Sequence, residues 1–237
     1  VDIHQINASS AAALQNCVDT SSYIGDTIIT RGYVVIDGNL SEVASSSVTG
    51  GSRPFISLVD TANGGAPGPF KGIAVMGVNA SGTPNTPNAD LENSLAGDLV
   101  ELTCVVADFA GLIQLQPLDN SSFNVLSFIN APTYQTVPVS DLQDNMRQNV
   151  LSTGEQWDGS YVEIQNVTVT SVSVFSGGSR VEFTVADASG NQILVADRFL
   201  PMRVNGVATV NPNSPKTTGN FVAPAVGTVY NLSLIHI

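Results

Sequence analysis

The sequence predicts an all-β chain made of two small barrel-like units in tandem, the second cut short before its closing strand. Three observations carry this prediction: polar and apolar residues alternate in many short segments, turn-forming residues separate these segments, and the same order of segments occurs twice. At 237 residues the chain is long enough for two domains of ordinary size.

Strand-like segments occur along the whole chain. Residues 27–35, 161–169 and 181–185 are rich in Val, Ile and Thr and alternate with a period of two. Clusters of Gly, Asn, Asp and Ser at 60–65 and 187–191 favour tight turns, because short polar side chains and glycine tolerate turn backbones. The pattern therefore predicts antiparallel hairpins and meanders.

Two segments look helical. Residues 11–15 give a weak helical pattern, and residues 139–147 give a stronger one, with Leu142 and Met146 four positions apart on one face. The second segment predicts a short helix between the two units.

The repeat has four parts that recur in one order. They are an aromatic residue and a glycine before a strand, a strand that ends in Asp before a turn, a short apolar strand, and a glycine before a further strand. The first copy has these parts at 23–29, 55–60, 72–75 and 96–102, and the second has them at 157–164, 183–187, 192–195 and 226–232. Loop insertions account for the unequal spacing.

On these residues the chain resembles the OB-fold modules that occur in tandem in secreted Bacteroidetes-type cell-surface proteins and extracellular nucleases. The first copy follows the motif order of that family from residues 25–32 through Asp60 and the G-I-x-V at 72–75 to a last hairpin at 107–116. The resemblance implies a five-stranded Greek-key barrel over residues 23–118.

The domain boundaries follow from the two copies. We expect an N-terminal extension, a first OB-like barrel, a linker with a short helix and a second, incomplete OB-like barrel, at 1–22, 23–118, 119–154 and 155–237. No hairpin follows the last matched strand, so the second barrel would leave an unpaired edge. Residues 232–237 resemble translated sequencing-adapter read-through of a metagenomic fragment, and we expect the natural protein to continue differently.

Acidic residues dominate the charge. The chain has 20 Asp and Glu against 8 Lys and Arg, a formal net charge of -12, and its basic residues are scattered singly. This disfavours binding to phosphate backbones, which needs a basic patch. No run of about 18 apolar residues occurs, so no membrane span is expected. Few Lys with many Asn, Ser, Thr and Asp favour a secreted or cell-surface location.

The two cysteines, Cys17 and Cys104, leave two interpretations open. They form one disulfide in an oxidising compartment, or they are unpaired. Alternation places Cys104 on the apolar face of its strand, which favours a buried thiol that packs as a small apolar side chain.

No catalytic motif is present. The sequence has no H-E-x-x-H, C-x-x-C, G-x-S-x-G or phosphate-binding glycine loop, and its two histidines, His4 and His236, lie near the ends. We therefore predict that the chain is not an enzyme and holds no cofactor, with calcium as the one open alternative.

Calcium ligands would come from the two turn regions that follow Asp-ending strands. Secreted proteins bind Ca²⁺ through carboxylate and amide oxygens of surface loops. The candidates are Asp60, Asn63, Asp187 and Asn191. Neither loop has the acidic density of a dedicated site, and turn formation explains the same residues.

A ligand-binding face on the first unit is the other candidate site. Stacking on bases or sugars needs aromatic side chains, and nucleotides also need cations nearby. The candidates are Arg31, Tyr33, Arg53, Phe55 and Lys71. Alternation favours core burial for Phe55, and the single tryptophan, Trp157, is interpreted as a packing anchor.

The sequence therefore favours a non-catalytic accessory or spacer module of an exported cell-surface protein, next to further domains of the same polypeptide. The first alternative is a region of an extracellular nuclease that contacts single-stranded polynucleotide. The second is an adhesin module that binds polysaccharide. Both rest on where OB-folds hold their ligands.

Overall fold

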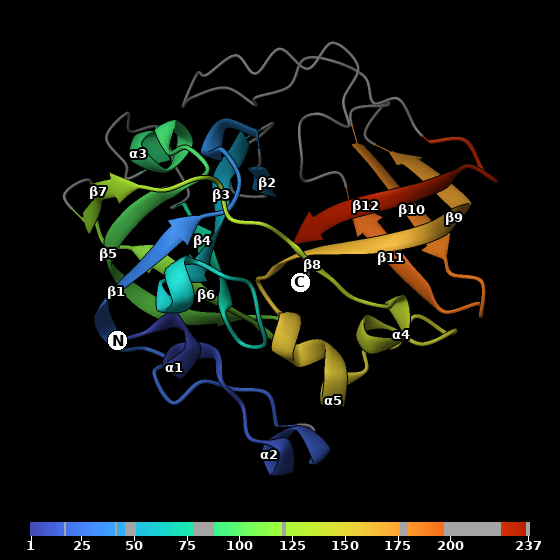
Figure 1. The fold of residues 1–237 in the computed structure, drawn as a ribbon, viewed down its shortest axis with the longest axis horizontal. Coiled ribbons are helices and arrows are strands. Elements are labelled where there is room, and N and C mark those ends of the chain that lie inside the picture. The colour runs from blue at the N-terminus through green and yellow to red at the C-terminus, as the bar shows by residue number, and fades with distance from the viewer. Residues whose placement is uncertain are drawn as a thin grey trace.

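The computed structural model describes residues 1–16, 18–40, 42–45, 51–77, 88–119, 122–175, 180–196 and 224–235. More of these residues lie in the strands of two sheets than in helices, and the helices are few and short, so the expected β-rich class is confirmed. The two sheets form two units that lie side by side, with short helices beneath them in the view of Figure 1.

The first unit contains seven strands and three short α-helices among the described residues. The strands are β1 (Thr27–Val34), β2 (Glu42–Ser45), β3 (Gly51–Asp60), β4 (Gly72–Met76), β5 (Asp98–Phe109), β6 (Leu112–Pro117) and β7 (Phe123–Phe128). The helices are α1 (Ile3–Asn7), α2 (Ala11–Gln15) and α3 (Asn88–Asn93), with 3-10 turns at Gly38–Leu40 and Ala62–Gly64.

Five of these strands close into a ring. The neighbours run β1-β3-β4-β6-β5, and β5 pairs back onto β1 from Val105 opposite Thr27 to Leu99 opposite Tyr33. Every pairing in the ring is antiparallel except that of β4 with β6, which is parallel. Strands β2 and β7 extend the sheet outside the ring.

The alternation of each strand fills the inside of this ring. Along all eight residues of β1, exposed or partly buried residues alternate with buried ones, so that Ile28 and Val34 point inward and Arg31 points outward. The inner side chains of all five strands form one core, to which Ile3 and Ile6 of α1 and Leu91 of α3 add from the ends. Each such apolar side chain stabilises the fold by about 1.5–3 kcal/mol.

The second unit is a sheet of five strands that does not close among the described residues. Its strands are β8 (Gln135–Thr136), β9 (Tyr161–Phe175), β10 (Arg180–Ala186), β11 (Gln192–Ala196) and β12 (Val229–Ile235). The antiparallel order is β11-β10-β9-β12, and β8 runs parallel to the start of β9. Its core also includes Val139 and Leu142.

The predicted linker contains α4 (Val139–Leu142) and α5 (Leu151–Gly154), and the 3-10 turn Glu155–Trp157 follows it. The helix expected over residues 139–147 is therefore wrong in its C-terminal half. The backbone becomes extended at Gln143 and then forms a loop in which Asp144 accepts the backbone N–H of Gln192 on β11. Tertiary contact with β11 outweighs the local helical pattern.

Two further sequence predictions can be placed on the fold. Cys104 lies on β5, its thiol is free, and its side chain is 0% exposed. Burial raises the pKa of this thiol to about 12, so it is unreactive. Cys17 lies outside the described residues. No helix among the described residues is long and apolar enough to cross a membrane.

Candidate functional site

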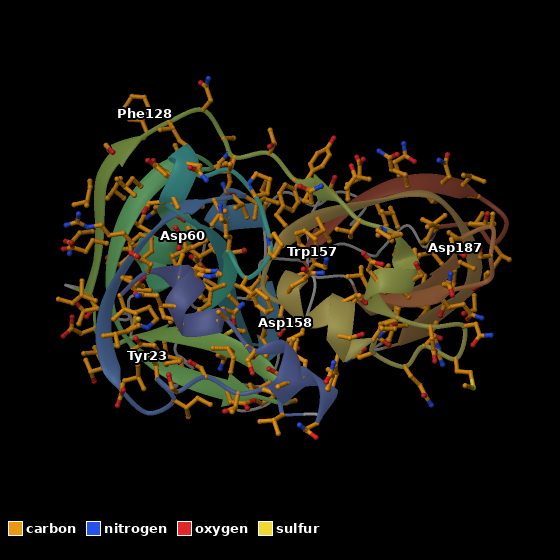
Figure 2. All side chains as sticks on the ribbon, turned by 60° about the horizontal axis from the view of Figure 1, so that its bottom comes forward. Tyr23, Asp60, Phe128, Trp157, Asp158 and Asp187 are labelled. Atoms are coloured by element: carbon orange, nitrogen blue, oxygen red, sulfur yellow. The ribbon has the colours of Figure 1, made fainter. Side chains whose placement is uncertain are left out.

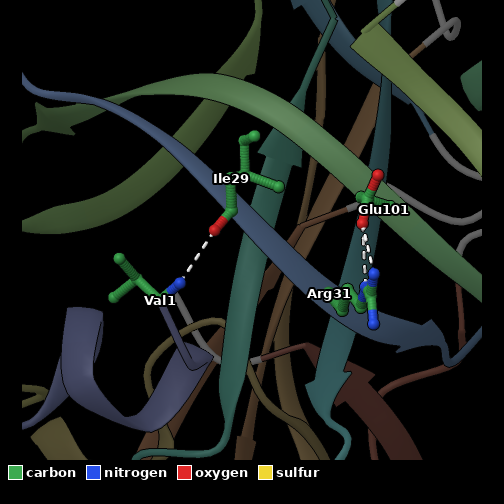
Figure 3. A network of polar contacts seen from close by, with 4 residues as sticks. All are labelled: Val1, Ile29, Arg31 and Glu101. Atoms are coloured by element: carbon green, nitrogen blue, oxygen red, sulfur yellow. Dashed lines mark hydrogen bonds and ion pairs between the residues drawn. The ribbon is translucent and has the colours of Figure 1, made fainter.

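Arg31, the first predicted ligand-binding residue, is engaged on the barrel wall. It lies on β1 directly opposite Glu101 on β5, and its Nε and Nη2 donate to the Glu101 carboxylate at 2.9 and 2.6 Å (Figure 3). On the same strand, the N-terminal amino group of Val1 donates to the carbonyl oxygen of Ile29 at 2.8 Å. The positive charge of Arg31 is therefore already neutralised.

The two aromatic candidates do not form an exposed platform. Phe55 is fully buried, and Tyr33 is partly buried against the same cluster on the outer face of β3 and β4. Phe55 is thus not a ligand-contacting residue in this structure, because the outer face on which it lies is covered by another part of the chain. The core interpretation of Phe55 is the correct one.

The other two candidates come from β3 and from the residue just before β4. Lys71 is half-buried just before β4, where its carbonyl oxygen accepts the backbone N–H of Asp60. Arg53 lies on β3 opposite Val43, and its side chain is outside the described part of the structure. Because Phe55 is buried and Arg31 is paired with Glu101, the candidates with described side chains do not form one open binding surface.

The predicted calcium ligands serve their own turns. Asp60 is 3% exposed. Its carboxylate accepts hydrogen bonds from the backbone N–H groups of Ala62, at 2.7 Å, and His4, at 3.0 Å. Asn63 is exposed and its backbone is left-handed. Asp187 accepts from the backbone of Ser189 and from both the backbone and side chain of Asn191. These are the bonds of Asx turns. Among the described residues no group of three or more His, Cys, Asp or Glu could hold a metal.

Residues 156–161 cover the outer face of β3 and β4. The carbonyl oxygen of Gln156 accepts a hydrogen bond from the backbone N–H of Phe70 at 2.7 Å. The Ser57 hydroxyl donates to the carbonyl oxygen of Gly159. Tyr161 packs on the apolar cluster around Phe55. Figure 2 shows the adjacent Trp157 and Asp158 between the two units. We call this contact the junction.

Asn7 ties the junction to the N-terminal extension. Its side-chain amide is buried and donates to the carbonyl oxygens of Gly72, at 3.0 Å, and Asp158, at 3.2 Å. Close backbone approach explains two glycines here. A Cβ on Gly72 would collide with the backbone of Ser160, and one on Gly159, where φ is +68°, would come within 2.8 Å of the Ala74 nitrogen.

An open cleft of about 440 Å³ lies beside the junction. It is lined by the turn between β5 and β6, by α5 and by three acidic residues, Asp19, Glu155 and Asp158. Glu155 and Asp158 are each 6% exposed although both are acidic. We call these three residues, together with nearby Asp108, the acidic cluster.

Three members of the acidic cluster, Asp19, Glu155 and Asp158, have raised pKa values. Burial raises the pKa of Glu155 from 4.5 to about 9, and the hydrogen bond it shares with Asp19 and the charges of the neighbouring carboxylates add to the shift. Burial, with the charges of Asp19 and Asp108, raises the pKa of Asp158 from 3.8 to about 8. The pKa of Asp19 is also raised, chiefly by burial. At neutral pH, therefore, Glu155 is protonated and donates its proton toward the Asp19 carboxylate.

The sequence gives little sign of this cluster. Asp19 and Glu155 come from the N-terminal extension and from the segment before β9, and no motif links them. The one available signal is the pair of acids on either side of Trp157, the predicted packing anchor, which is 8% exposed and belongs to the second core. An acid next to a buried aromatic residue is itself placed in a region of low water access.

Comparison of the chain with protein-family models and with curated proteins finds no match.

Proposed function

We propose that the chain is a non-catalytic spacer module of an exported cell-surface protein, in which two OB-like barrel units are held in a fixed relation. The observation that carries this proposal is the junction, where residues 156–161 bury the outer face of β3 and β4. A face that is occupied by the chain's own backbone is suited to joining two units rather than to taking up a ligand.

The OB-like assignment of the first unit is supported by its connectivity. A five-stranded barrel of Greek-key order is the OB architecture. Here the ring order β1-β3-β4-β6-β5 contains a single parallel pair, and α3 lies in the chain between β4 and β5 with Leu91 in the core.

The assignment of the second unit is supported by its pairings. Strand β9 pairs with β10 and β12, and β10 pairs with β11. These pairings repeat those of β1 with β3 and β5, and of β3 with β4. The strand that would correspond to β6 has no counterpart among the described strands. We infer that the second unit is an OB-like barrel without its closing strand.

The polynucleotide alternative receives less support. The net charge is -12, the one ion pair among the described residues neutralises Arg31, and Phe55 is buried. With Arg31 paired and Phe55 buried, these two candidate residues offer little to a phosphate backbone or to bases.

A binding titration at low salt tests the spacer proposal. We expect fluorescein-labelled single-stranded DNA and a panel of soluble polysaccharides to show no saturable binding in fluorescence anisotropy and microarray measurements. Low salt favours electrostatic binding most, so a DNA affinity that disappears as salt is added would instead support the nuclease-accessory role. Polysaccharide binding that survives high salt would support the adhesin role.

A further inference from the structure

Two polar side-chain atoms at the junction are buried without a partner. The indole Nε1 of Trp157 and the hydroxyl oxygen of Ser160 have no hydrogen-bond partner among the described residues. The two residues are only 8% and 7% exposed. Buried indole N–H groups and hydroxyls usually have a partner, because leaving one unpaired costs the free energy of its desolvation. Each of the two atoms therefore indicates a ligand that forms hydrogen bonds.

The backbone brings these two side chains to the contact between the units. The N–H of Ser160 donates to the carbonyl oxygen of Trp157 at 2.9 Å, so the two residues lie in one tight turn. Trp157 belongs to the core of the second unit. The Ser160 hydroxyl oxygen lies against Gly72 of β4, where an added Cβ would come within 2.3 Å of it. The unpaired hydroxyl is thus at the surface of the first unit.

A small cavity lies among the same residues. Its volume is about 10 Å³, and Trp157, Ser160 and Gly72 are among the residues that line it. The wall comes from both units, since it also includes Leu58 of β3 and Tyr161 of β9. A cavity needs about 10–15 Å³ of such space to hold a water molecule. This one therefore has room for a single water molecule and for no larger ligand.

We propose that the junction binds one water molecule in this cavity, held by the indole N–H of Trp157 and the hydroxyl of Ser160. Water fits both groups, because it accepts from an indole N–H and can donate to or accept from a hydroxyl. The inference rests on the closed junction, on which the proposed spacer role also depends. It makes this water a structural part of the contact between the two units.

Oxygen-17 relaxation dispersion of the full chain measures the site, because it detects whole water molecules that are held by the protein and does not detect hydroxyl protons. Ser160→Ala should lower the number of long-lived waters by about one, since the water would lose one of its two partners. The matched control is Ser94→Ala. It removes a buried hydroxyl of the first unit that already donates to the carbonyl oxygen of Leu91 at 2.7 Å, so the number should stay unchanged.

NMR of the unaltered protein gives a second measurement that does not depend on the folding of a variant. Trp157 is the only tryptophan, so its indole N–H gives a single signal. We expect cross-relaxation between this proton and water, with the sign of a water molecule that tumbles with the protein. An indole proton without it, or equal numbers of long-lived waters in Ser160→Ala and the control, would overturn the water site and leave the spacer proposal standing. Saturable binding of single-stranded DNA or polysaccharide would instead contradict the spacer role and leave the water site standing.

Discussion

The first and second units share their strand pairings but differ in closure. In the first, β6 follows β5 through the two-residue turn at Ala110 and Gly111 and fills the gap between β5 and β4. In the second, β11 and β12 each pair with one strand among those described. The side chains nearest this gap, such as Val195 and Leu232, are only partly buried, whereas the inner side chains of β4 and β5 are fully buried. Among the described residues, β6 therefore accounts for the difference between the fully buried core of the first unit and the partly buried edge of the second.

We expect the largest effect on the free energy of unfolding from a comparison of two valines at matching positions of the repeat. Val75 on β4 is fully buried and Val195 on β11 is partly buried. Val75→Ala should lower the free energy of unfolding of the first unit by about 2–3 kcal/mol, because it removes buried methyl groups and leaves a cavity. Val195→Ala should cost about 1 kcal/mol or less in the second unit.

Urea denaturation followed by circular dichroism measures both losses. Amide hydrogen exchange then assigns each loss to its unit. Equal losses at the two positions would mean that the second unit is as well sealed as the first, and the contrast between the units would be lost.

The next effect is at the junction. Gly72→Ala puts a Cβ against the Ser160 backbone and should weaken the contact between the units by about 1–3 kcal/mol, as overpacking commonly does. The measurement is the emission maximum of Trp157, which should move to longer wavelength at neutral pH. Gly68→Ala is the matched control, since its Cβ would meet only the Lys71 side chain, at 3.4 Å or more. An identical response of the two variants would show that the close approach at Gly72 is unimportant.

The smallest effect concerns the ion pair on the barrel wall. The Arg31 and Glu101 side chains are 59% and 30% exposed, so Arg31→Ala should cost less than about 1 kcal/mol of unfolding free energy. The loss should shrink further as salt screens the pair. Urea denaturation at low salt measures this loss. A loss above about 2 kcal/mol would indicate that the ion pair contributes more to the stability of the barrel than its exposure implies.

The sequence predicts the strands well because their period of two is a local property. The inward side chains of β1, the turn at Asp187 and the burial of Cys104 all follow from residues within a few positions of each other. Alternation also identifies the face on which Phe55 lies, but it does not identify the segment that covers that face.

The junction and the acidic cluster could not be predicted because both depend on contacts between distant residues. Asn7 and Asp158 are 151 positions apart, and their hydrogen bond exists only because the two units are docked. The hydrogen bond between Asp19 and Glu155 depends on the same docking. The raised pKa values are thus properties of the assembled fold rather than of any motif.

Nitrogen-15 NMR relaxation of the full chain at about pH 6 tests most directly whether the junction fixes the two units. Units fixed by the junction should give one rotational correlation time for the amides of both sheets, as for a single body of 237 residues. Two different and shorter correlation times, one for β1 to β7 and one for β9 to β12, would show units that tumble independently and would contradict a fixed junction.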